Sequence, residues 1–263
     1  MITSTQNQIA TTNDARYEYI LRLADDRLIL GHRLSEWCGH GPILEEDIAL
    51  ANIALDYIGH SAALYEHAAE LEGEGRHRDE LVYFRDDPQY KNLKITELPR
   101  GDFGFTVARQ FLFSVFSYLL YRELSDIDDE QLGGIVGKHL KEIKYHLRHS
   151  REWVLRLGDG TEESHLRIQE AFDELWMYTD AMFYMNEVDE TLISEQLAVD
   201  LESLRPAWKE TVIEVLEEAT LQVPDFDQHM VGGGRNGFHT EHLGHLLAEM
   251  QHLRRSYPDA DWE

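Results

Sequence analysis

Residues 128–157 read DDEQLGGIVGKHLKEIKYHLRHSREWVLRL. Apolar side chains recur along this stretch at three- and four-residue intervals or their multiples: Leu132, Val136, Leu140, Ile143, Leu147, Val154 and Leu157. This spacing places them on one face of an α-helix. The acidic residues 128–130 suit the positive end of the helix dipole, and the sequence Gly158-Asp159-Gly160 predicts the end of the helix. The stretch is therefore predicted to be one long amphipathic helix of a helical bundle.

The same periodicity extends outward over most of the chain. Helices are predicted over six further segments, at about 14–37, 42–71, 103–124, 164–185, 206–219 and 240–256. No run of alternating polar and apolar residues predicts a sheet. Residues 76–101 contain three turn signals and no sustained period, which suits a long crossover connection. The predicted fold is all-α, a four-helix bundle with additional C-terminal helices.

Composition indicates the domain organisation and the compartment. Residues 1–13 are polar and are expected to form a disordered N-terminal tail, and residues 14–263 a single helical domain. The chain has one cysteine and no signal-peptide pattern, so we expect a cytoplasmic protein. Its net charge of −26 argues against nucleic acid and anionic membranes as partners. No stretch approaches the ~20 consecutive apolar residues of a membrane span.

A four-helix bundle raises the question of a di-iron site. Such a site takes one carboxylate from each of two helices and a Glu-x-x-His pair from each of two others. None of the four long core helices contains Glu-x-x-His. The nearest arrangements are Asp56 with His60 and Glu142 with His146, both at i+4 spacing, and Asp25 in the first helix. A hydrogen-bonded or surface pair is the ordinary interpretation of Glu142 and His146, so no metal and no catalytic residue is predicted.

Several segments, in order along the chain, resemble one family. The segments are LSEWCGH (34–40), DIALANIALD (47–56), RDDPQYKNL (85–93), VARQ (107–110), KEIKYHLR (141–148), HTEHLG (239–244) and LAEMQ (247–251). They are similar to the ferritin-like structural subunits of phenylacetyl-CoA epoxidase, the PaaC family. The resemblance extends from about residue 17 to residue 255, which is nearly the whole chain.

The resemblance implies a function and a set of partners. The family's enzyme epoxidises the ring of phenylacetyl-CoA during aerobic phenylacetate degradation. The di-iron centre belongs to a separate ferritin-like catalytic subunit, and a reductase with flavin and iron–sulfur groups supplies electrons. The chain would then bind no cofactor, and Asp25, Asp56, Glu142 and His146 would be vestigial metal-site positions. We expect a non-catalytic subunit in a higher hetero-oligomer, with self-association as a further option.

Two surfaces are predicted on this basis. The loop Gln89, Tyr90, Lys91 and Asn92 matches a family segment that would contact the acyl-CoA near the subunit interface; a loop packed on the bundle is the simpler interpretation. The aromatic third helix carries Phe113, Phe116 and Tyr118, which cannot all face one core stripe. Some of them are therefore expected at the interface, with core packing as the equal alternative. The competing hypothesis for the whole chain is a di-iron oxygenase in its own right. That hypothesis requires metal ligands at Asp25 or Glu36, Asp56, Glu142 and His146.

Overall fold

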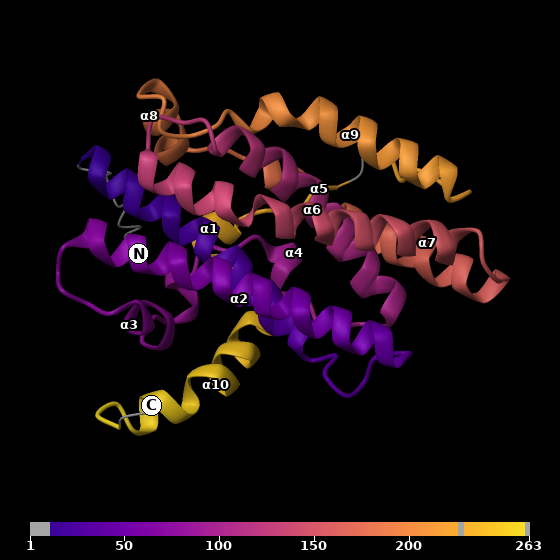
Figure 1. The fold of residues 1–263 in the computed structure, drawn as a ribbon, viewed down its shortest axis with the longest axis horizontal. Helices are drawn as coiled ribbons and strands as arrows, with labels where there is room; N and C mark the ends of the chain where they lie inside the picture. Colours follow the sequence, from indigo (N-terminus) through magenta and orange to yellow (C-terminus); the bar gives the residue numbers. More distant parts are fainter. Residues whose placement is uncertain (1–10, 226–228, 261–263) are drawn as a thin grey trace, which may run out of the picture.

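Four long helices form the centre of the fold in the computed structural model, which describes residues 11–225 and 229–260. They are α1 (Thr12–Ser35), α2 (Leu44–Glu72), α5 (Phe103–Leu124) and α6 (Glu130–Gly158). α1 packs along α2 and α5 along α6, and the two pairs meet to form the bundle (Figure 1). Within the described ranges all regular structure is helical, so the all-α prediction is confirmed.

Shorter elements surround the bundle. They are α3 (Arg78–Tyr83), α4 (Lys94–Glu97), α7 (Glu162–Trp176), α8 (Glu187–Ser194), α9 (Leu201–Glu218) and α10 (Glu241–Ser256), with the 3₁₀ turns η1 (Asp87–Gln89), η2 (Asp180–Phe183) and η3 (Gly234–Asn236). α7 and α9 pack against α5 and α6, on the side of the bundle away from α10 (Figure 1). The connection at 76–101 contains the short helices α3 and α4. They were not predicted because this segment shows no sustained period.

The helix boundaries follow from capping residues. The Thr11 side chain accepts a hydrogen bond from the Asp14 amide, so α1 begins at Thr12, within the predicted tail. Residues 1–10 of that tail lie outside the described residues. α9 begins at Leu201 because Asp200 caps it, and Pro206, the predicted start, lies inside the helix. α7 ends at Trp176 rather than near residue 185, and η2 follows it.

α5 is the core helix. By length and composition it could cross a membrane, but 83% of its most apolar window is buried inside the protein. A helix that is apolar all round is typical of a core surrounded by other helices. Phe113 and Phe116 are 0% and 1% exposed, so of the two alternatives for them core packing is the one that the structure supports. Tyr118 is half-buried.

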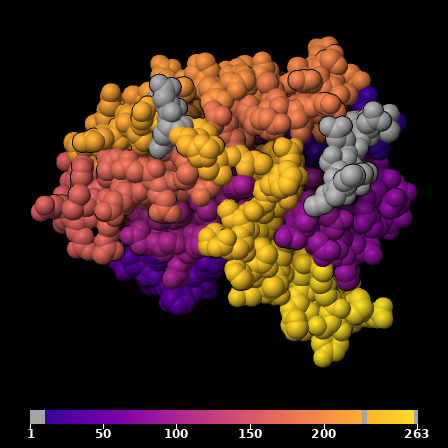
Figure 2. All heavy atoms as spheres, turned by 180° about the vertical axis from the view of Figure 1, so that it is seen from behind, coloured from indigo at the N-terminus to yellow at the C-terminus, as the bar shows by residue number. Residues whose placement is uncertain are grey.

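The C-terminal segment returns to the N-terminal half of the chain. Figure 2 shows it crossing the back of the molecule between the early helices and the orange residues of the α8–α9 region. A Cβ on Gly234 would lie 2.1 Å from the Asn92 carbonyl oxygen, and Gly237 has a φ of 78° beside Pro88. Only glycine allows so close a backbone approach and that conformation. The segment is thus packed from Gly234 onward against residues 88–94.

Candidate functional site

The centre of the bundle brings together two histidines from different helices. His60 of α2 and His146 of α6 are both fully buried, and their ring centroids lie 6.3 Å apart. Three positions before each histidine, on the same helix face, lie Tyr57 and Ile143, which are also fully buried. The i, i+3 geometry of a di-iron site is thus present on both helices. Tyrosine and isoleucine stand where that site requires glutamate.

The other two helices of the bundle add no carboxylate to this centre. From α5, the Gln110 side-chain amide donates a hydrogen bond of 2.7 Å to the Tyr57 hydroxyl. No Asp or Glu is among the buried residues of α5, and the same is true of α6, which supplies His146. The buried carboxylates of α1 are Asp25 and Asp26, and both form ion pairs with arginines from other segments.

α1 instead places a positive charge in the core. Arg27 is fully buried, and its guanidinium carbon lies 4.4 Å from the ring centroid of Tyr121 and 5.5 Å from that of Phe113. Its nearest carboxylate, Asp26, is 3.7 Å away and already pairs with Arg235. A buried guanidinium raises the electrostatic cost of placing iron nearby. The residues at the bundle centre therefore do not fit a di-iron group.

The environment also keeps His60 neutral. Burial, followed by the proximity of His139, His146 and Arg27, holds the pKa of His60 well below its ordinary value. The Glu142 carboxylate accepts a hydrogen bond from His60, but 43% of its side chain is exposed and water screens its charge. A neutral imidazole can donate one hydrogen bond and keeps one free lone pair.

Three of the four residues named as vestigial metal-site positions lie outside the bundle centre. The Asp56 and Glu142 side chains are 31% and 43% exposed and accept hydrogen bonds from the buried histidines. The pairing crosses between helices, because His146 binds Asp56 at 2.9 Å and His60 binds Glu142 at 2.6 Å. Asp25 faces away from the centre, toward the loop after α3. Of the four residues, His146 lies at the bundle centre.

These contacts belong to a row of histidine–carboxylate pairs between α2 and α6. Besides the two crossed pairs, His139 donates to Glu142 at 2.9 Å and His149 to Glu46 at 2.8 Å. The sequence search missed His60 as a partner of Glu142 and missed His139 altogether. His139-x-x-Glu142 was the available signal, since it has the i, i+3 spacing in reversed order.

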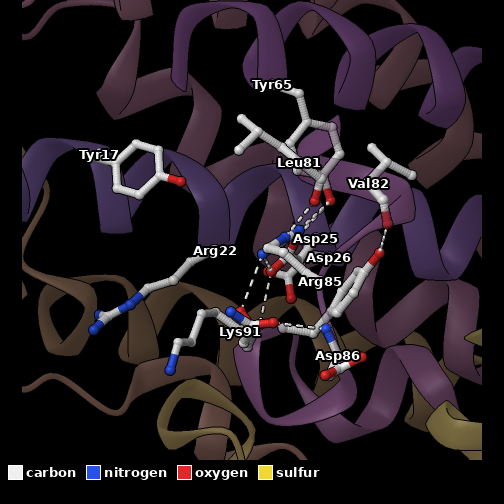
Figure 3. A network of polar contacts seen from close by, with 12 residues as sticks. Tyr17, Arg22, Asp25, Asp26, Tyr65, Leu81, Val82, Arg85, Asp86 and Lys91 are labelled. Atoms are coloured by element: carbon white, nitrogen blue, oxygen red, sulfur yellow. Dashed lines mark hydrogen bonds and ion pairs between the residues drawn. The ribbon is translucent and has the colours of Figure 1, made fainter. Parts of the chain in front are cut away.

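A second polar network surrounds Asp25. Its carboxylate accepts hydrogen bonds from Arg85, from the Tyr65 hydroxyl and, at 2.7 Å, from the Lys91 amide (Figure 3). The adjacent Asp26 accepts from the Leu93 amide at 2.7 Å and pairs with Arg235 at 2.8 Å. These bonds hold the 85–97 connection and the C-terminal segment against α1.

The loop predicted to contact acyl-CoA is divided between core and surface. Tyr90 is fully buried and its hydroxyl donates to the Val82 carbonyl at 2.5 Å. Asn92 is also fully buried and donates to Glu97 at 2.8 Å. Gln89 is exposed, and Lys91 is half-buried with its side chain pointing away from the Asp25–Arg85 pair (Figure 3). Of the four residues, these two have side-chain atoms available to a ligand.

Comparison with known proteins agrees with the resemblance of the sequence segments. The family described as phenylacetic acid catabolic protein matches residues 1–262. The chain belongs to this family. A relative in it, one of the subunits of 1,2-phenylacetyl-CoA epoxidase from Escherichia coli strain K12, is 46% identical over 244 residues. The match covers 93% of this chain and 98% of the relative.

Structural comparison supports the fold of this family member. A Synechococcus protein with aldehyde deformylating oxidase activity superposes with a TM-score of 0.54. The superposition covers 81% of this chain and 94% of that chain, at 16% sequence identity. At this identity the likeness concerns the fold alone, and it confirms the predicted ferritin-like bundle.

Proposed function

We propose that this family member is a non-catalytic subunit of a phenylacetyl-CoA epoxidase and supports a separate di-iron catalytic subunit. One observation carries the proposal: Arg27, Tyr57, Gln110 and Ile143 occupy the bundle centre, where a di-iron protein of this fold needs carboxylates. The Escherichia coli relative is named as one subunit of its epoxidase, which supports a role within a multi-subunit enzyme. The di-iron group would belong to the partner, and flavin and iron–sulfur groups to a reductase.

The contact surface for the catalytic subunit is proposed on α2. Leu44, Ile48 and Leu55 are 71%, 54% and 67% exposed, and their spacing of four and seven residues aligns them on one helix face. Tyr145, 38% exposed, adds an aromatic ring from the neighbouring α6. Exposed apolar side chains gathered on one face are typical of a protein-binding surface. This face replaces the aromatic residues of α5 as the predicted interface.

The first experiment measures iron and complex formation. The chain is expressed alone in iron-supplemented medium and, separately, together with a candidate catalytic subunit of an epoxidase operon. We expect no stoichiometric iron in the chain alone, and a complex whose epoxidation of phenylacetyl-CoA depends on this chain. Two irons per isolated chain with oxygenase activity would contradict the proposal.

A matched pair of variants tests the proposed surface. Leu55→Asp places a charge at the centre of the α2 face and should weaken the complex by at least about tenfold. Leu253→Asp introduces the same charge at a leucine of α10 that is 53% exposed, and should leave the complex unchanged. Size-exclusion chromatography and calorimetric titration measure both. Equal binding by wild type and Leu55→Asp would place the interface elsewhere.

The acyl-CoA contact is proposed for Gln89 and Lys91. Lys91 is a cation in a chain of net charge −26, and CoA carries anionic phosphates. In the reconstituted enzyme, Lys91→Ala should raise KM for phenylacetyl-CoA and leave complex formation unchanged. An unchanged KM would return the loop to a purely structural role.

A further inference from the structure

A compact group of nitrogen and oxygen ligands lies between α2 and α6, beside the bundle centre. It consists of His60, His139 and Glu142, whose ligand atoms all lie within 4.8 Å of one another. His60 Nε2 is 2.6 Å and His139 Nδ1 2.9 Å from the same oxygen, Glu142 Oε2. The two imidazole rings have centroids 3.9 Å apart. The geometry points to a mononuclear Zn²⁺ site that nothing in the proposed function requires.

The ligand set suits zinc in number and in kind. Two imidazole nitrogens and one carboxylate oxygen are the protein ligands of many three-residue zinc sites, with water at the fourth position. In a tetrahedral zinc site with bonds of about 2.0–2.1 Å, neighbouring ligand atoms lie about 3.3 Å apart. The carboxylate oxygen therefore has to retreat by about half an ångström, and the two histidine nitrogens, which lie within 4.8 Å of each other, have to reach the same spacing. Glu142 can do so because 43% of its side chain is exposed.

His60 is in the form that a metal requires. His60 is held neutral, and a neutral imidazole offers one unprotonated nitrogen. Binding through Nε2 moves its ring proton to Nδ1, which has no hydrogen-bond partner at present. The His60 Nδ1 atom therefore lacks a hydrogen-bond partner both without zinc and with zinc bound. His60 is the buried ligand of the site, and Glu142 is its partly exposed ligand.

The surroundings favour a cation at this position over the bundle centre. Arg27 is fully buried in the core, whereas 43% of the Glu142 side chain is exposed. Asp56, paired with His146, adds a second carboxylate to the same seam. The net charge of −26 also raises the local concentration of cations around the chain. Zinc here would link α2 to α6 across the row of histidine–carboxylate pairs.

The test uses the purified full-length chain, stripped with a chelator and titrated with ZnCl₂ against a chromophoric competitor. We expect one tightly held Zn²⁺ per chain. His139→Ala and Glu142→Gln should each weaken binding by at least about 100-fold, more than the loss of a neighbouring hydrogen-bond partner costs. Co²⁺ in place of Zn²⁺ should give the intense visible absorption of a four-coordinate ion, and both variants should lose it.

The control variant is His149→Ala. His149 lies on the same helix, forms the same kind of pair with Glu46 at 2.8 Å and is not a ligand, so zinc affinity should not change. Glu142→Gln alters a partly exposed side chain and keeps the test valid if His139→Ala does not fold. Failure of the wild type to retain Zn²⁺, or equal affinity in Glu142→Gln, would overturn the inference. Neither result bears on the proposed role in the epoxidase, which is tested by iron content and complex formation.

Discussion

At the position just before Tyr57 and just before Ile143, the chain carries a carboxylate, Asp56 and Glu142 respectively. One residue along an α-helix turns the side chain by about 100°. Both carboxylates therefore lie at the edge of the bundle rather than at its centre. There each accepts a hydrogen bond from the histidine of the other helix. Acidic residues are thus present on both helices and still cannot serve a central metal.

Asp25 has a structural role at the same scale. Its carboxylate is fully buried and is the partner of Arg85, which is also buried. Asp25→Asn leaves the Arg85 charge without a counterion, and should lower the free energy of unfolding by about 3–5 kcal/mol. Chemical denaturation followed by circular dichroism measures the change.

The control is Asp56→Asn, whose amide oxygen can still accept the hydrogen bond from His146. Because the Asp56 side chain is 31% exposed, its loss of charge should cost less than about 1 kcal/mol. Equal losses in the two variants would show that burial of the Asp25–Arg85 pair does not govern its contribution.

At the scale of elements, the start of α6 depends on Asp129. This side chain accepts the Leu132 amide as N-cap and pairs with Arg16 of α1 at 2.7 Å, so it fixes one helix against another. Burial raises the pKa of Asp129, but His67, the Leu132 amide and Arg16 outweigh burial and hold it well below the ordinary value of 3.8. Its charged form therefore stabilises the fold above that pH.

The sign of this shift predicts a pH dependence. Asp129→Asn keeps a capping side chain and loses the charge, so at about pH 7 it should be about 1–2 kcal/mol less stable than wild type. Below pH 3.8, Asp129 of the unfolded wild type binds a proton, whereas in the folded protein it stays charged to a lower pH. The difference between the two proteins should then shrink as pH falls to about 3. Urea midpoints at the two pH values measure it, and a constant difference would refute the assignment.

At the scale of the whole molecule, the C-terminal segment closes the structure. Arg235 pairs with Asp26 of α1, and His239 with Glu97 of α4 at 2.8 Å. Gln251 of α10 donates to the Val82 and Arg85 carbonyls, each at 2.9 Å. Residues about 140 or more positions apart in sequence therefore form one polar core that positions the 85–97 connection.

Gly234→Ala tests this closure. The added Cβ would meet the Asn92 carbonyl oxygen, a backbone atom that cannot rotate away, and the free energy of unfolding should fall by about 1–3 kcal/mol. Gly244→Ala in α10 is the matched control, because no atom lies within 4 Å of its Cβ. That variant should gain about 0.5–1 kcal/mol from the helix propensity of alanine. Thermal and urea unfolding compare them, and a neutral Gly234→Ala would mean that the segment does not pack as described.

Local pattern predicted the long helices, most of them by a periodic apolar stripe and α5 by its nearly continuous apolar composition. The seven predicted helices correspond to α1, α2, α5, α6, α7, α9 and α10. The short helices α3, α4 and α8 were not predicted. Each has eight residues or fewer, too few to show a clear period, and their positions follow from packing against the bundle.

The sequence by itself determined the helical class, the length of the core helices and the family, since each of these depends on local pattern or on ordered motifs. Only the tertiary structure decided which face of α2 and α6 meets the centre, because that depends on how four helices rotate against one another. It also brought Arg85, Arg235 and Glu97 to their partners on other segments. A periodicity of three or four residues reports only on neighbours along one helix, so it cannot predict contacts between residues far apart in the chain.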